Sequence, residues 1–127
     1  MRNDLHKRYA IIVAYVPSIE RDKIELEINK FKELVTSMEG RIEKHEYLGL
    51  KKLAYKIKKY ESAHYVQYYI KFEANKHLKK YLFDLNRKIS PTLNLNTLRH
   101  MIMKIEHQDF NFNILKNYEG FENSLKI

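Results

Sequence analysis

The chain has 127 residues and no cysteine, which fits one domain with its own core and excludes disulfides, zinc–thiolate sites and thiol catalysis. Its hydrophobic fraction of 44% is typical of a globular protein, and no apolar run is long enough to cross a membrane. The formal net charge of +8 is concentrated, because residues 47–105 carry thirteen basic and three acidic side chains whereas residues 1–46 carry nine of each. This pattern predicts a polyanionic partner, although ordinary solvated lysines would also explain part of the charge.

The first two predicted elements are a strand and a helix. Residues 9–16 are apolar at nearly every position, which indicates a central strand that is buried on both faces. Apolar side chains then recur at steps of four, three, four and three, which predicts an amphipathic helix, and Gly40 is expected to end it. The stripe on this helix consists of Ile24, Ile28, Phe31, Val35 and Met38.

A long hairpin is predicted next. Residues 41–60 indicate a strand with a bulge or bend at Gly49, and residues 60–62 are the expected turn. The following strand alternates in character, so one set of side chains is expected in the core and the other on an open face of the sheet. The core set is His64, Val66, Tyr68, Ile70 and Phe72, and the open set is Tyr65, Gln67, Tyr69 and Lys71.

The second half of the chain completes the pattern. A helix is predicted from about Asn75, a loop over residues 86–96 and a last strand over residues 98–105. The order strand, helix, strand, strand, helix, strand indicates an α+β protein with the ferredoxin-like split βαβ fold, a four-stranded antiparallel sheet with both helices on one face. We expect residues 1–106 to form this domain and residues 107–127 to form a polar C-terminal tail, disordered by itself and free to dock on a partner.

Signatures of catalysis and cofactor binding are missing from the sequence. The six histidines are scattered without metal-ligand spacing, and the three glycines cannot form a phosphate-cradling loop. Acylphosphatases share the predicted topology, but residues 16–19 (Val-Pro-Ser-Ile) stand where such an enzyme needs a Gly-rich turn. We therefore expect no catalytic residue, no metal site and no cofactor.

The open sheet face carries tyrosines that suit either a base or a protein. Tyr15, Tyr65 and Tyr69 could stack on bases, as in the RNA-recognition motif, but the predicted third strand lacks the Gly and the neighbouring Arg of that motif. Packing against a partner protein is the favoured interpretation for Tyr65 and Tyr69.

Basic side chains cluster on the predicted hairpin and on the two strands next to it. Five lysines fall within residues 51–59, and a phosphate backbone would suit them. Lysines on an edge strand can instead prevent aggregation between sheets, so a purely structural role stays open for Lys56, Lys58 and Lys59. The residues that we predict to contact RNA are Lys7, Arg8, Lys51, Lys52, Lys56, Arg99 and Lys104.

One long motif resembles a known family. Residues 46–57, EYLGLKKLAYKI, follow a Gly-led strand and match the pattern E-x-[WL]-G-[LR]-[RK]-x-L-A-Y-x-I of the bacterial-type small-subunit ribosomal protein six family. The opening Lys7-Arg8-Tyr9, the pair His64-Tyr65 and the pair Leu98-Arg99 also match, so the resemblance covers about residues 7–106. The chain departs from the family at Ala10, where Glu is common, and in a longer connection around Pro91.

The resemblance implies a function as well as a fold. Members of this family are structural constituents of the small ribosomal subunit, where they bind the central domain of its RNA beside small-subunit ribosomal protein eighteen and catalyse nothing. The resemblance carries RNA contact to Arg8, Lys51, Lys52 and Arg99, and carries contact with the partner protein to Tyr47, Leu48 and Leu50. It implies a ribosome in the bacterial cytoplasm or the mitochondrial matrix. The alternative is a ferredoxin-like protein-interaction or small-ligand regulatory domain that binds no RNA.

Overall fold

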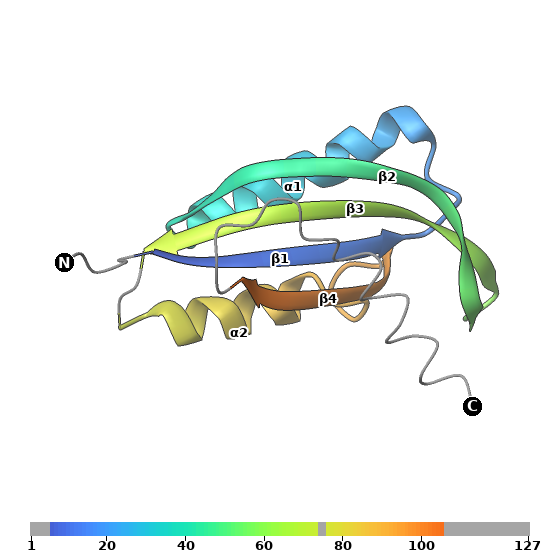
Figure 1. Ribbon diagram of the computed structural model, residues 1–127. Coiled ribbons are helices and arrows are strands. Elements are labelled where there is room, and N and C mark those ends of the chain that lie inside the picture. The colour runs from blue at the N-terminus through green and yellow to red at the C-terminus, as the bar shows by residue number, and fades with distance from the viewer. Residues whose placement is uncertain (1–5, 74–75, 106–127) are drawn as a thin grey trace.

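The described part of the chain forms one four-stranded antiparallel sheet with two helices on one face (Figure 1). The structure is a computed structural model that describes residues 6–73 and 76–105. The strands lie in the order β2-β3-β1-β4, so β2 and β4 are the edges, and the predicted ferredoxin-like arrangement is confirmed. In chain order the elements are β1 (His6–Tyr15), the 3-10 turn η1 (Arg21–Lys23), α1 (Ile24–Ser37), β2 (Gly40–Ile57), β3 (Tyr60–Glu73), α2 (Leu78–Lys88) and β4 (Thr97–Ile105).

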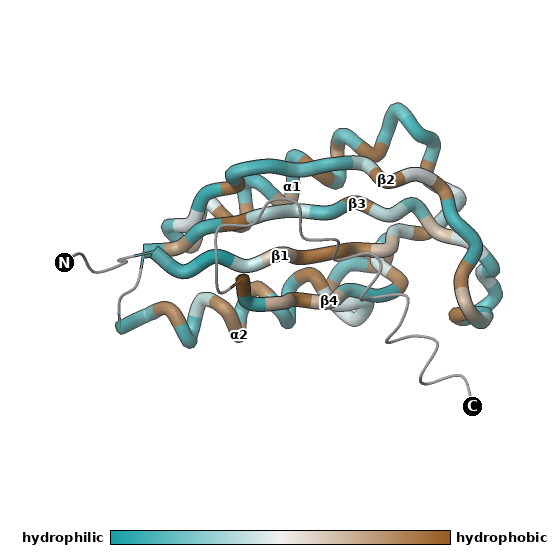
Figure 2. The backbone as a smooth tube through the Cα atoms, in the orientation of Figure 1, coloured by the Kyte–Doolittle hydropathy of each residue, from teal (hydrophilic) through white to brown (hydrophobic). Residues whose placement is uncertain are grey.

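Strand β1 is one of the two inner strands of the sheet, and its residues are apolar on both faces. Each of residues 9–15 is 8% exposed or less. The strand pairs along its whole length with β3 and, from Arg8 onward, with β4 on its other side. Figure 2 shows hydrophobic residues concentrated in its middle, which agrees with the prediction of a central strand.

The helices cover one face of the sheet and form the larger core with it. The predicted stripe of α1 is buried, and the Phe31 ring stacks on Tyr68 of β3 with the ring centroids 3.9 Å apart. The hydroxyl groups of Tyr15 and Tyr68 lie 2.9 Å apart within this core and share a hydrogen bond. Helix α2 adds Leu85, which is fully buried, so both helices lie on the same side as predicted.

The opposite face of the sheet is also largely buried, which differs from the open face that we predicted. Tyr65 and Tyr69 are 2% and 1% exposed and belong to a second apolar cluster with Ile12 and Leu53. The alternation of β3 was therefore predicted correctly, but its second set of side chains is not open to solvent. Alternation shows which residues share a face and does not show what covers that face.

Gly40 has a different role from the one predicted. Helix α1 ends at Ser37, and Glu39, rather than the glycine, takes the left-handed backbone conformation with φ of 64°. Gly40 is the first residue of β2, where a Cβ atom would lie 2.5 Å from Cε1 of Phe72 and 2.9 Å from Cγ1 of Val35. The glycine is needed because the strand passes too close to the core for any side chain.

The predicted irregularity at Gly49 is confirmed as a β-bulge. Tyr47 pairs with Val66 and Gly49 pairs with Tyr65, so Leu48 is an extra residue on β2. The φ of Gly49 is +110°, a conformation that disfavours side chains. Figure 1 shows the end of the β2–β3 hairpin curving away from the plane of the sheet.

Several boundaries differ from the predicted ones. The hairpin turn is Lys58-Lys59, with Ile57 paired to Tyr60, so the turn comes before the predicted residues 60–62. Helix α2 continues to Lys88 and so takes the first part of the predicted loop 86–96. No described helix is long and apolar enough to span a membrane. The predicted start of α2 at Asn75 and the predicted tail 107–127 lie outside the described residues.

Candidate nucleic-acid interface

The hairpin end and the start of β4 lie together, although β2 and β4 are opposite edges of the sheet. Leu53 of β2 is 5% exposed and packs in the same cluster as Leu98 of β4. The Arg99 guanidinium donates a hydrogen bond to the Tyr55 hydroxyl and lies 5.1 Å from the centroid of its ring. The bend of the hairpin therefore brings Arg99 to Tyr55, in the strand that carries the lysines.

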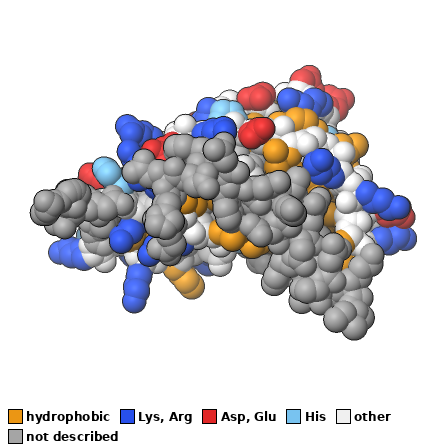
Figure 3. All heavy atoms as spheres, viewed as in Figure 1, with side chains coloured by type: hydrophobic (Ala, Val, Ile, Leu, Met, Phe, Trp, Pro, Cys, Tyr) orange, Lys and Arg blue, Asp and Glu red, His pale blue; other side chains and the backbone are white. Residues whose placement is uncertain are grey.

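These cations form a group that we call the hairpin-end cluster, defined as Lys51, Lys52, Lys56, Lys58, Lys59 and Arg99. All of its lysines except the half-buried Lys51 are exposed. Figure 3 shows Lys and Arg side chains gathered over the tip of the hairpin. The ion pair of Lys56 with Glu61 spans 3.7 Å and both side chains are 65% exposed, so it is weak and easily exchanged for another anion.

The remaining predicted RNA contacts lie at the other end of the sheet. Lys7 and Arg8 are half-buried near the start of β1, and Lys104, opposite Tyr9, is exposed near the end of β4. The structure thus places four of the seven predicted residues at the hairpin end and three elsewhere. The four in the hairpin-end cluster are Lys51, Lys52, Lys56 and Arg99.

Arg8 belongs to an internal ion group that sequence reasoning missed. Its Nε lies 3.0 Å from Oε1 of Glu43, whose other oxygen lies 3.6 Å from Nζ of Lys71. The three side chains are only 13%, 17% and 14% exposed, respectively. Glu43 is the extra residue of a second bulge in β2, between Ile42 and Lys44, and only the strand order places it near β1. RNA contact by Arg8 stays a prediction and would compete with this group.

The residues predicted to contact a partner protein fall into two kinds. Leu50 is 56% exposed on the edge strand β2, and Leu48 is partly buried beside the second apolar cluster. Tyr47 is half-buried, with the Arg21 guanidinium 3.9 Å from its ring centroid. Tyr65 and Tyr69 are buried, and Tyr69 accepts a hydrogen bond from Gln67. The expectation that these two tyrosines present open surface is therefore wrong.

His64 organises the edge beside Tyr47. Its Nε2 lies 2.8 Å from the carbonyl oxygen of Ile19, and its Nδ1 lies 2.8 Å from the Tyr47 hydroxyl. Because a carbonyl can only accept, Nε2 donates, and in the neutral ring Nδ1 accepts from the tyrosine. This chain of hydrogen bonds fixes the Tyr47 ring at the edge of β2. Leu50 is the most exposed large apolar side chain of that strand.

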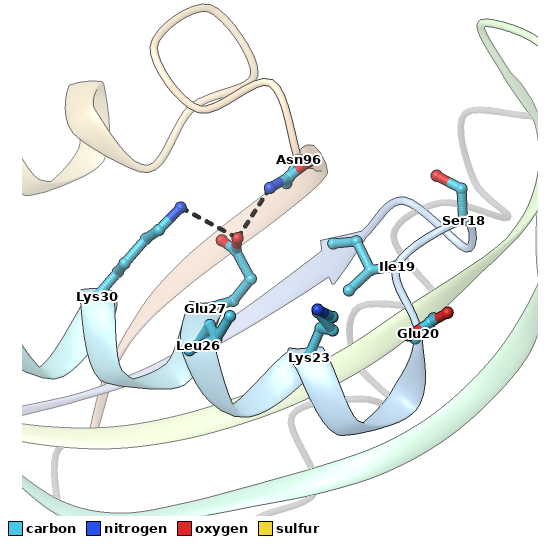
Figure 4. Close-up of a pocket in the computed structure, with 8 residues that line it drawn as sticks. All are labelled: Ser18, Ile19, Glu20, Lys23, Leu26, Glu27, Lys30 and Asn96. Atoms are coloured by element: carbon cyan, nitrogen blue, oxygen red, sulfur yellow. Dashed lines mark hydrogen bonds and ion pairs between the residues drawn. The ribbon is translucent and has the colours of Figure 1, made fainter.

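A cavity on the helix side is a concave feature that the sequence did not reveal (Figure 4). It has a volume of about 550 Å³ and lies between the start of α1 and the loop before β4. Glu27 on its wall is 5% exposed and accepts hydrogen bonds from Nζ of Lys30, at 3.2 Å, and Nδ2 of Asn96, at 2.8 Å. The Glu27 carboxylate thus ties the loop to α1, a structural role. Among the described residues, no group of three His, Asp or Glu could hold a metal ion.

Comparison with known proteins gives a consistent set of relatives. Residues 8–104 match the family model described as Ribosomal protein S6. The small ribosomal subunit protein bS6 of Orientia tsutsugamushi (strain Ikeda) is 31% identical over 98 residues, 77% of each chain. That of Clostridium perfringens (strain SM101 / Type A) is 31% identical over 100 residues, 79% of this chain and 98% of the relative. The crystal structure of 30S ribosomal protein S6 from Thermotoga maritima matches in fold, with a TM-score of 0.67 and 18% identity, over 96% of this chain and 99% of that one.

Proposed function

Because the chain belongs to the ribosomal protein S6 family, we propose that it binds the central domain of small-subunit ribosomal RNA together with small-subunit ribosomal protein eighteen. Membership of the family makes it a protein of the small ribosomal subunit with a structural rather than an enzymatic role. This agrees with the expectation from the sequence that the chain is not an enzyme. The choice of RNA region and of protein partner is our proposal.

The hairpin-end cluster is the observation that carries the RNA part of the proposal. It places Arg99 against Tyr55 of the strand that carries the exposed lysines, so one end of the sheet offers cations from two strands. A lysine ammonium group is a compact point charge on a flexible side chain, which suits binding to a phosphate. The guanidinium of Arg99 is instead held in place by Tyr55. Such contacts position a protein on RNA without reading the base sequence, and they weaken steeply as salt rises.

The outer edge of β2 is the surface that we propose for the partner protein. This strand pairs only with β3 among the described residues, so its other edge has backbone groups available. Leu50 is exposed on it next to the fixed Tyr47 ring. An exposed edge with apolar side chains is a surface that a partner protein can cover. Its closeness in sequence to Lys51 and Lys52 would let RNA and partner meet at one place.

The ribosome that contains this protein is, in our proposal, a bacterial one. The two bS6 relatives reported above, from Orientia tsutsugamushi and Clostridium perfringens, are proteins of bacteria. This supports the bacterial cytoplasm over the mitochondrial matrix as the site of action.

The test is a binding titration of the full-length chain against a central-domain RNA fragment, with and without protein eighteen. Lys52→Gln with Lys56→Gln should weaken binding by about tenfold, as expected when about two phosphate contacts are lost. The matched control is Lys23→Gln with Lys32→Gln, which removes the same charge from the helix side and should leave affinity nearly unchanged. Equal losses for the two double variants would contradict a localised interface. If the wild-type chain did not bind this RNA, the proposal would be wrong. The alternative of a protein-interaction domain that binds no RNA would then remain.

A further inference from the structure

Helix α2 carries a second cationic surface, which no part of the proposed interface uses. Lys79, Phe83 and Arg87 stand at four-residue steps, and Lys80 lies beside them, so all four share one side of the helix. The three cations are exposed, and Phe83 is 67% exposed in the middle of the group. We call these four residues the α2 stripe.

The stripe points away from the core, so its phenylalanine has no packing role. The opposite side of α2 supplies Leu78, Tyr81, Leu82 and Leu85, and these pack against the sheet. Leu85 is fully buried, whereas Phe83, two residues before it, is among the most exposed large apolar side chains of the described residues. A large aromatic side chain surrounded by cations is therefore presented to solvent rather than to the core.

The charge of this region is positive and weakly compensated. Residues 76–88 contain five basic side chains and one acidic one. That acid, Asp84, lies 3.9 Å from Arg87 in a pair whose side chains are 28% and 52% exposed. An ion pair this exposed contributes little to stability, and Arg87 can readily exchange Asp84 for another anion. Within the described residues, no carboxylate forms an ion pair with Lys79 or Lys80.

The position of α2 separates most of the stripe from the tip of the hairpin. Helix α2 lies in the helix layer, and its Asn86 side chain lies 2.7 Å from His100 of β4. The tip of the hairpin lies at the other end of the view in Figure 1, and Figure 3 shows Lys and Arg side chains in both places. A single short stretch of nucleotides covering the hairpin would not account for both surfaces.

From these observations we infer that the α2 stripe binds a second segment of RNA, which contains an unpaired nucleotide. The inference rests on the proposed function and extends it to a new contact. Lys79, Lys80 and Arg87 contact phosphates, and the Phe83 ring stacks on the unpaired base. An aromatic side chain flanked by cations is the combination that binds single-stranded nucleic acid, because every base has a stacking face. An acidic protein segment would use the cations but has no need of an exposed ring.

The experiment uses the full-length chain, the same RNA and protein eighteen, with hydroxyl-radical footprinting beside the titration. Phe83→Ala should weaken binding by about tenfold, because stacking one base on an aromatic ring contributes on that scale. Phe83→Tyr keeps the ring and should bind as the wild type does. Leu26→Ala removes another exposed apolar side chain, 57% exposed on α1, and should also leave affinity unchanged.

The footprint separates this inference from the proposed function. Lys79→Gln with Lys80→Gln should expose one set of protected nucleotides and leave the set that depends on Lys52 and Lys56 intact. An unchanged footprint and affinity for this variant and for Phe83→Ala would overturn the inference while leaving the hairpin interface standing. The inference would equally be wrong if the α2 variants lost binding only when protein eighteen is present, since that would assign the stripe to a protein. Thermal melting of each variant, expected within about 2 °C of the wild type, checks that the fold is kept.

Discussion

The two ends of the sheet use the same residue types for different purposes. Near the start of β1, Arg8 and Lys71 surround the Glu43 carboxylate, and all three side chains are less than 20% exposed. At the hairpin end, Lys56 and its partner Glu61 are both 65% exposed. A cation in the first group is held by the fold, whereas a cation in the second group is available to an external anion.

This difference shows that burial and partners, not residue type, decide what a basic side chain does. Removing one member of a buried ion group leaves an uncompensated charge out of water, so the cost appears in stability. Removing an exposed lysine changes the free energy of unfolding little and changes attraction for a polyanion more. The two ends should therefore respond oppositely to the same kind of substitution.

The largest effect should come from Glu43→Ala. The change leaves Arg8 and Lys71 side by side, mostly buried and without their carboxylate. We expect the free energy of unfolding to fall by about 3 kcal/mol, near the lower end for broken buried ion pairs because the group keeps some exposure. Urea denaturation of the variant and of the wild type measures this fall in the free energy of unfolding.

Glu46→Ala is the matched control for that prediction. Glu46 lies on the same strand and is exposed, so its loss should cost less than about 0.5 kcal/mol. Similar losses for the two variants would mean that the internal ion group does not stabilise the fold.

The buried tyrosine pair predicts a dependence on alkaline pH. Burial raises the pKa of Tyr15 and, more strongly, that of Tyr68 above the ordinary value of 10.0. Above pH 10 the unfolded chain therefore releases protons that the folded chain keeps, and stability that is fully present below pH 10 is lost as pH rises. Each tyrosine contributes up to about 1.4 kcal/mol per pH unit to this loss.

The double variant Tyr15→Phe with Tyr68→Phe isolates that contribution. Urea unfolding at pH 8 and pH 11 gives the loss of free energy of unfolding between the two pH values. This loss should be smaller in the variant than in the wild type by about 2–3 kcal/mol. The same pH dependence in both proteins would show that the two hydroxyl groups do not keep their protons in the fold.

Gly40→Ala should have the next largest effect. The added methyl would lie 2.5 Å from Phe72 and 2.9 Å from Val35, in a core that has no room for it. We expect a loss of about 2 kcal/mol from overpacking, measured by thermal or urea unfolding.

Gly49→Ala separates crowding from backbone conformation. Nothing lies within 4 Å of a Cβ at Gly49, but its φ of +110° strains any other residue, so a loss of about 1–2 kcal/mol is expected. Phe72→Leu, which shortens the crowding side chain, should recover part of the loss in Gly40→Ala and none of the loss in Gly49→Ala.

The smallest effect on stability should come from the hairpin. Lys51→Ala with Lys52→Ala removes one half-buried and one exposed lysine, and the free energy of unfolding should change by less than about 0.5 kcal/mol. Binding to RNA should weaken in the same variant. A parallel fall in stability would assign these lysines to the fold and not to an interface.

Most of the fold could be predicted from the sequence because its signals are local. The apolar run of β1, the stripe of α1 and the alternation of β3 indicate whether each segment is a strand or a helix. They also indicate which of its side chains share a face. The errors have local causes too. The left-handed conformation fell on Glu39 beside the expected Gly40, and on Lys58 at a turn that has no glycine.

The candidate site was harder to predict because it depends on contacts between distant residues. Sequence reasoning selected Arg8 and Arg99 on equal grounds, as basic residues that match basic positions of the resembling family. The structure gives the first an internal partner, Glu43, 35 residues away, and places the second against Tyr55 on a bent hairpin. Neither the bulge that presents Glu43 nor the bend that carries Tyr55 has a clear sequence signal beyond Gly49. The burial of Tyr65 and Tyr69 was missed for the same reason.

The salt dependence of RNA binding tests the central claim most directly. For wild type and for Lys52→Gln with Lys56→Gln, the logarithm of the association constant should be measured against the logarithm of salt concentration. The account predicts that the double variant has a slope shallower by about 1.4–1.8, since each lost phosphate contact removes about 0.7–0.9. Equal slopes for the two proteins would contradict phosphate binding by the hairpin-end cluster.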